Sequence, residues 1–180
     1  MIIIYLLNET IKDFFPMSQK VKFSLSKLLV ILVLASVGGA CPSTSRMNYE
    51  FSPPPSEWIP ERSSNGALIL RKENPPMGIM VNTECERYQN VPLEPLSRTL
   101  YIGFENRKEV ERGTAVVDGN EAVMVVMECT LDGMPLKIKS YTFKAGECIY
   151  DLVYFAGTED FDLGLGYFEE FVKSFKIERK

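Results

Sequence analysis

Three short turns in the second half of the chain constrain its fold more than any other feature. Asp118-Gly119, Asp132-Gly133 and Ala145-Gly146 each stand between two runs that are rich in apolar residues. An Asp-Gly pair between such runs is the strongest short-range signal for a β-hairpin, because both residues accept the backbone conformation of a tight turn. The sequence therefore predicts an antiparallel meander of four strands between residues 112 and 156.

Both faces of this predicted sheet carry apolar side chains. With two-residue turns, Met127 faces Ile138 and Phe143 faces Cys148. The register puts Val123, Val125, Met127, Ile138, Ile149, Val153 and Phe155 on one face and Met124, Val126, Tyr141, Phe143, Tyr150, Leu152 and Tyr154 on the other. A sheet with one side in water would alternate apolar and polar residues. We therefore expect helices to cover both faces.

Two segments with helical spacing of their apolar residues are the candidates for these covers. The first carries Leu96, Leu100 and Phe104 after Pro92, and the second, residues 159–175, carries Phe168, Phe171, Val172 and Phe175 on one side. Gly164 and Gly166 lower the helix propensity of the second segment, and we explain them by close packing on the sheet. Shorter strands are predicted at residues 49–51, 66–72 and 78–83, so the chain predicts an α+β fold.

The order of these elements resembles that of the PsbP/Mog1-like group of proteins. The resemblance rests on Pro53 and Trp58, the mid-chain helix, the meander and the closing run Phe168 to Phe175, and it extends over residues 49–178. It implies an α/β sandwich in which helices cover a meander sheet. Its relatives include small envelope lipoproteins, and members act as accessory or assembly factors more often than as enzymes. No shared catalytic residue comes with the resemblance.

The first 40 residues have the layout of a secretory signal peptide. Three lysines between residues 20 and 27 precede an apolar run from Leu28 to Val37, and small residues follow as far as Ala40. The apolar run is shorter than the roughly 20 residues that a membrane-spanning helix needs. Two acidic residues near the amino terminus do not suit a basic leader, which favours Met17 as the start and residues 1–16 as a start-site artefact.

The run Val37-Gly38-Gly39-Ala40-Cys41 resembles the lipobox of bacterial lipoproteins. The resemblance implies cleavage before Cys41 and acylation, with palmitate-like chains, of its sulfur and its new amino group. One acyl chain binds a membrane marginally, whereas two or more hold firmly. Residues 41–48 then form a polar tether and residues 49–180 a single domain. Ordinary secretion without lipid is the alternative.

Three further cysteines predict a disulfide, because an exported protein meets an oxidising compartment. In the predicted register Cys129 and Cys148 are roughly 23 Å apart along the sheet and point to opposite faces. A disulfide needs Cα atoms within about 7 Å, which excludes this pair. We favour Cys85–Cys148, with Cys85 in the loop before the first helix, and a buried thiol at Cys129. No second cysteine or histidine lies near to activate a redox thiol.

Composition narrows the functional classes. The chain contains no histidine, which excludes Ser-His-Asp and Cys-His catalysis and HExxH zinc sites. Its net charge of −4 is unlike that of a general nucleic-acid binder. Glu128 and Asp151 lie within predicted strands, where we expect edge exposure or pairing with Lys137 or Lys139 rather than catalysis. We expect no metal and no cofactor.

These observations lead to a non-catalytic, lipid-anchored envelope protein that binds or assists another envelope component. An alternative is a carrier or sensor of a small apolar ligand, because Tyr141, Phe143, Tyr150 and Tyr154 share one face and could line an apolar groove. The competing interpretation of these four residues is a core under a helix. A thiol- or carboxylate-based enzyme has the least support. Pro42 after the cysteine favours the periplasmic side of the outer membrane, by resemblance to lipoprotein sorting.

Overall fold

The computed structural model describes residues 49–178, apart from 53–54, 64–66, 86–87 and 89, together with Ile11. The predicted signal peptide (Ile11 excepted), Cys41 and the predicted tether lie outside the described residues, as does Pro53 of the family resemblance.

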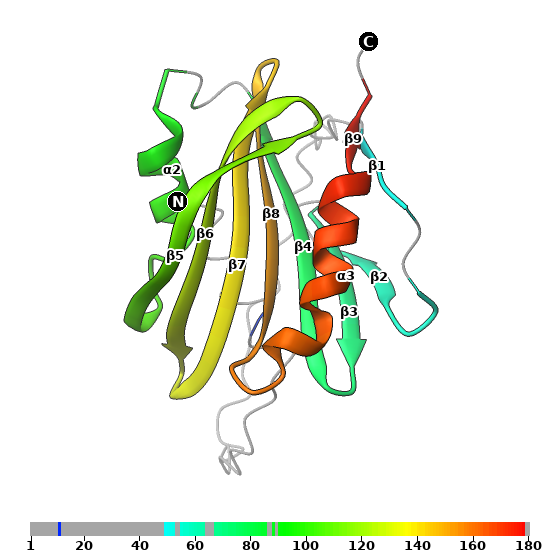
Figure 1. Cartoon of the computed structure of the whole chain (residues 1–180), viewed down its shortest axis with the longest axis vertical. Coiled ribbons are helices and arrows are strands. Elements are labelled where there is room, and N and C mark those ends of the chain that lie inside the picture. The colour runs from blue at the N-terminus through cyan, green and yellow to red at the C-terminus, as the bar shows by residue number, and fades with distance from the viewer. Residues whose placement is uncertain are drawn as a thin grey trace, which may run out of the picture.

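A seven-stranded antiparallel sheet forms the centre of the fold, with strand order β2-β3-β4-β8-β7-β6-β5 (Figure 1). Its strands are β2 (Ile59–Arg62), β3 (Leu68–Glu73), β4 (Pro76–Cys85), β5 (Glu105–Val117), β6 (Asn120–Leu131), β7 (Met134–Ala145) and β8 (Cys148–Gly157). Two helices, α2 (Leu93–Thr99) and α3 (Phe161–Ser174), accompany the sheet, and β1 (Tyr49–Glu50) pairs with β9 (Lys176–Ile177) beside it. The predicted α+β organisation is confirmed.

The predicted meander is present as β5 to β8. Asp118 and Gly119 both have positive φ, as do Asp132 and Gly133, which is the conformation of type I′ hairpin turns. β5 begins at Glu105, seven residues before the predicted start at Arg112. This early part of β5 is charged and exposed, and it escaped the sequence analysis because an edge strand needs no alternation of apolar residues.

The register between β7 and β8 differs from the predicted one by two residues. Phe143 faces Tyr150 rather than Cys148, because β7 continues to Ala145 and the turn consists of Gly146 and Glu147. Gly146 has a φ of 58°, a conformation that favours glycine at the first position of such a turn. A slip of two residues leaves every side chain on its predicted face, since side chains alternate with a period of two.

The two faces of the sheet carry separate cores. We call the face with Tyr141, Leu152 and Tyr154 the α3 face, because the buried side of α3 packs on it. The opposite face, with Ile138 and Val153, is the α2 face, on which α2 packs mainly against β6 and β7. Figure 1 shows α3 in front of the sheet, at the side of β4 and β3, and α2 beside β5 and β6. Helices therefore lie on both faces, as the apolar pattern predicts.

Candidate functional site

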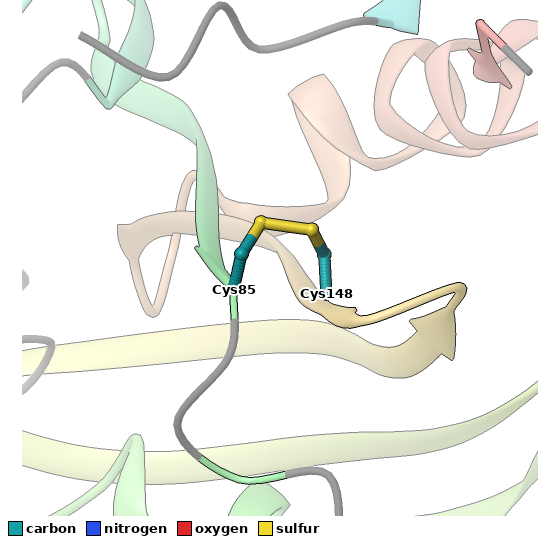
Figure 2. Close-up of a disulfide and its surroundings, with 2 residues drawn as sticks. All are labelled: Cys85 and Cys148. Atoms are coloured by element: carbon teal, nitrogen blue, oxygen red, sulfur yellow. A yellow bond between two sulfur atoms is a disulfide. The ribbon is translucent and has the colours of Figure 1, made fainter. Parts of the chain in front are cut away.

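Cys85 and Cys148 form a disulfide at the end of the sheet where β4 adjoins β8 (Figure 2). Cys85 is the last residue of β4 and faces Cys148, the first residue of β8, with their Cα atoms 4.0 Å apart. This is the pair that the sequence analysis favoured, but the position of Cys85 differs. The bond joins two neighbouring strands rather than a helix-entry loop and the sheet, because β4 extends two residues beyond its predicted end.

Cys129 keeps a free thiol on the α2 face. Its side chain is buried, and this burial raises the pKa of the thiol to about 12. A thiol is nucleophilic as its thiolate, so Cys129 is inert at neutral pH. It is a core residue, as predicted.

Tyr141, Phe143, Tyr150 and Tyr154, the candidate ligand groove, lie buried beneath α3. None of the four is more than 6% exposed. Two aromatic residues of the helix region fill the space above them: the Phe168 ring lies 5.8 Å from that of Tyr141 and 5.6 Å from that of Tyr154, and the Phe175 ring lies 6.2 Å from that of Phe143. The four residues are therefore core in this structure.

A glycine in α3 allows this close approach. A Cβ atom at Gly164 would lie 2.5 Å from Oη of Tyr154 and 2.6 Å from Sδ of Met77, closer than real contacts allow. The hydroxyl of Tyr154 also donates a hydrogen bond of 2.8 Å to the backbone oxygen of Phe161 in the first turn. Close packing explains Gly164 but not Gly166, whose Cβ position meets nothing within 4 Å.

A charged contact fastens the middle of α3 to β7. Nζ of Lys139 lies 2.6 Å from Oε1 of Glu169, and the hydroxyl of Tyr141 donates to Glu169 at 3.0 Å. Lys139 and Glu169 are 14% and 31% exposed, so this pair sits at the border between the core and solvent. The ion pair holds α3 against β7, and its two charged groups bind each other.

A row of polar residues that was not predicted from the sequence crosses the α2 face. Asn82 on β4 and Thr142 on β7 both face Asp151 on the central strand β8. Thr142 Oγ1 donates to one carboxyl oxygen of Asp151 at 2.9 Å, and Nδ2 of Asn82 donates to the other at 3.4 Å. Asp151 is 2% exposed and its partners are neutral.

The prediction for Asp151 was therefore wrong, since neither edge exposure nor a lysine accounts for it. Burial raises the pKa of its carboxyl from 3.8 to about 6, although both hydrogen bonds lower it. Glu128, the other strand acid, is paired with Lys108 at 3.1 Å. The signal that could have revealed the row was polar residues in otherwise apolar strands, but the alignment of β4 with β8 was needed to bring Asn82 to Asp151.

A second buried polar pair lies beside this row. The hydroxyl of Tyr101, just after α2, and that of Ser140 on β7 are 2.7 Å apart. Both residues are buried, and burial raises the pKa of Tyr101 far above its usual range. This pair connects the end of α2 to the sheet.

The described part of the chain holds neither a metal-binding cluster nor a membrane-spanning helix. No group of three or more acidic, cysteine or histidine side chains gathers there in a way that could hold a metal ion. None of the helices in that same part is both long enough and apolar enough to cross a bilayer.

Comparison with solved structures places this arrangement among known folds. Cyanobacterial PsbP (CyanoP) from Synechocystis sp. PCC 6803 matches 81% of this chain and 99% of its own, with a TM-score of 0.54 and 13% identity. The fold is PsbP-like. LpqN of Mycobacterium tuberculosis, involved in cell envelope biogenesis, matches 73% of this chain and 83% of its own, with a TM-score of 0.54 and 11% identity.

The same PsbP-like fold extends to a protein of unknown function from Pseudomonas aeruginosa, PA94. The match covers 69% of this chain and 99% of that protein, with a TM-score of 0.51 and 9% identity. No family model and no curated protein matches the sequence. At these identities the likeness concerns the fold, and the functional argument has to come from the residues of this chain.

Proposed function

We propose that this chain is a lipid-anchored protein of the bacterial cell envelope, and that its folded part is a non-catalytic module that binds or assists another envelope component. The observation that carries the proposal is Cys41, which follows a basic start, an apolar run and three small residues. Acyl chains on Cys41 hold the protein at a bilayer, since two or more chains bind firmly. Residues 42–48 separate the module from the membrane surface.

Two features of the folded part support this proposal. Structural disulfides persist in oxidising compartments such as the periplasm, and Cys85–Cys148 is such a bond. The PsbP-like fold is also that of LpqN, a protein involved in cell envelope biogenesis. The protonated thiol of Cys129 and the buried carboxyl of Asp151 do not offer an accessible nucleophile or base, which favours binding over catalysis.

Mass spectrometry of the protein produced in a bacterium tests the anchor directly. The amino-terminal peptide should begin at Cys41 and carry the added mass of a diacylglyceryl group and an amide-linked acyl chain. A Cys41→Ser variant should leave the membrane fraction, whereas a Cys129→Ser variant should stay in it. Residue 41 found bare, or still joined to the leader, contradicts the proposal.

Purification of the intact acylated protein from envelope membranes tests the second half of the proposal. We expect one particular envelope protein to co-purify with the acylated protein in a fixed ratio. Pro42 favours the outer membrane, so the complex should fractionate with outer-membrane markers. Recovery of the acylated protein alone, at all protein concentrations tested, contradicts the accessory role.

A further inference from the structure

The first strand, β1, lies at one end of the long axis of the sheet. Figure 1 shows β1 and β9 at the upper end of the molecule, together with the turns 118–119 and 146–147. We call this end the entry end. The turns 74–75, 132–133 and 158–160, which follow β3, β6 and β8, lie at the opposite end, which we call the far end.

Aromatic contacts hold the start of the folded part at the entry end. The ring of Tyr49 in β1 stacks on that of Phe175, just after α3, with 5.0 Å between the ring centroids. The ring of Phe51, just after β1, lies 5.0 Å from that of Phe171 in the last turns of α3. Because Phe175 and Phe171 are both buried, these rings attach β1 to the core rather than to a loop.

Hydrogen bonds add to this attachment. The backbone N–H of Ser52 donates to Oγ of Ser174 at 3.0 Å. Asp118, in the turn between β5 and β6, accepts a hydrogen bond of 3.1 Å from the backbone N–H of Ile177 in β9 and lies 3.1 Å from Nζ of Lys176. Since β9 pairs with β1, the point at which the chain enters the fold is fixed to both α3 and the sheet.

We propose that the entry end faces the lipid bilayer and that the far end points away from it. This inference rests on the proposed function, because it needs the acyl chains on Cys41. Tyr49 is the eighth residue after Cys41. A chain extends by at most about 3.5 Å per residue, so Tyr49 lies within roughly 28 Å of the acylated residue. β8, with ten residues, spans about 33 Å between the two ends and carries the far end beyond this distance.

The charge of the folded part favours this upright position over one in which a side of the molecule lies on the membrane. Residues 49–180 contain 22 acidic and 15 basic residues. Anionic lipids repel such a body over a range of about 10 Å at 0.1 M salt. The exposed part of the edge strand β5, residues 105–112, has three acidic and three basic residues, so this side does not supply a basic patch for the membrane.

This orientation determines which surface a partner reaches. A component embedded in the same bilayer meets the entry end, with its two turns and the disulfide Cys85–Cys148. A component that approaches from the space outside the bilayer meets the far end. The proposal thus assigns to the entry end the contact with lipid headgroups and with proteins that reside among them.

Two exposed glutamates, one near each end, provide matched positions for a test. Glu121 is the second residue of β6 and follows the turn that contains Asp118, whereas Glu159 lies in the turn between β8 and α3. The variants Glu121→Cys and Glu159→Cys are each labelled with a thiol-reactive donor dye. The natural protein is the control and should take up no dye, because the thiol of Cys129 is buried and the other two cysteines of the fold are bonded.

Energy transfer to the membrane measures the distance of each label from the lipid. The labelled acylated proteins are added to preformed vesicles of phosphatidylethanolamine and phosphatidylglycerol that carry an acceptor dye on their headgroups. Transfer from position 121 should exceed transfer from position 159 at least about twofold, because position 159 lies roughly 30 Å farther along the strands. Equal transfer from the two positions, or stronger transfer from position 159, overturns the proposal.

Failure of the orientation remains distinguishable from failure of the lipid anchor. Mass spectrometry identifies the amino terminus of each labelled protein, and sedimentation of the vesicles measures binding. Protein that begins at acylated Cys41 and binds the vesicles, but shows equal transfer from both labels, has the anchor without the orientation. Protein that has no acyl chain and does not bind contradicts the proposed function itself.

Release of β1 tests whether its attachment sets the orientation. The double change Tyr49→Ser and Phe51→Ser removes both ring contacts, so that the next buried side chain along the chain is that of Trp58. With the longer tether we expect the difference in transfer between positions 121 and 159 to shrink. Circular dichroism and thermal unfolding check that the variant folds. An unchanged difference in a folded variant overturns the role of β1.

Discussion

The two faces of the sheet bury apolar cores of different size and different chemistry, and the core of the α3 face is the larger. The α3 face is aromatic: α3, 14 residues long, lays Phe168 onto the rings of Tyr141 and Tyr154 in the sheet. The α2 face is mainly aliphatic, and its helix has seven residues. It also buries Asp151 with two neutral hydrogen-bond partners, and the hydroxyl pair of Tyr101 and Ser140.

Because of this difference, the two faces contribute differently to the stability of the fold. Apolar burial and ring packing stabilise the α3 face, and its charged pair, Lys139 and Glu169, lies at the border between the core and solvent. On the α2 face a carboxyl is held away from water, which costs free energy when it is ionised. We infer that the packing of the α3 face contributes most to the stability of the fold.

Truncation of an α3 ring should give the largest effect on stability. Phe168→Ala removes a fully buried side chain that contacts the rings of Tyr141, Tyr154 and Phe171, so the free energy of unfolding should fall by about 3–5 kcal/mol. Leu163→Ala, in the same helix but 71% exposed, should change it by about 0.5 kcal/mol or less. Urea denaturation measures both. Similar losses for the two variants would show that α3 does not fix the fold.

The cysteines provide the next comparison between the faces. Replacing both Cys85 and Cys148 with Ser should lower the free energy of unfolding by up to about 4 kcal/mol, because the bond closes a long loop in the unfolded chain. Cys129→Ala, which breaks no cross-link, should cost about 1 kcal/mol. Thermal and urea unfolding with and without a reductant measure these losses. A reductant that destabilises the double variant as much as the natural protein would contradict this assignment.

The buried carboxyl on the α2 face should give a smaller effect that depends on pH. The pKa of Asp151 rises from 3.8 to about 6 on folding, because burial disfavours its charged form. Its contribution to stability therefore declines as pH rises from about 4 to about 6 and is constant above. Asp151→Asn removes this penalty and should stabilise the protein by about 1–3 kcal/mol at pH 7 and hardly at all at pH 4.

Urea denaturation of Asp151→Asn and the natural protein at a series of pH values checks this expectation. Glu128→Asn, a change to an acid that is paired near the surface, is the matched control and should not produce the same pH-dependent gain. A gain for Asp151→Asn that persists undiminished at pH 4 would mean that the carboxyl is not the cause.

Much of the fold could be predicted because its signals are local. The Asp-Gly pairs at 118 and 132 determine two turns, and the alternation of side chains assigns residues such as Val125 and Val126 to opposite faces. The aromatic spacing in α3 predicted which side of the helix is buried. Each of these features depends on neighbours within a few residues, where steric and hydrophobic preferences act directly.

The functional features were harder to predict, because they depend on how distant segments align. Alternation cannot detect the two-residue slip between β7 and β8, since the slip preserves every face. Asp151 looked like an edge or ion-paired acid until β4 was known to lie beside β8, which brings Asn82 to it from 69 residues away. The sequence pattern of Tyr141, Phe143, Tyr150 and Tyr154 fits either a ligand groove or a buried core. The structure shows a core, because α3 packs on these residues.

By itself the sequence determined two of the hairpin turns and the two-sided apolar sheet, because turn geometry and side-chain alternation are properties of short segments. The tertiary structure decided which strand carries Cys85 and what partners Asp151 has. These depend on strand order and long-range packing. Many segments of this chain are apolar enough to pair as neighbouring strands. Which of them pair is set by the free energy of the whole fold, and no single segment determines it.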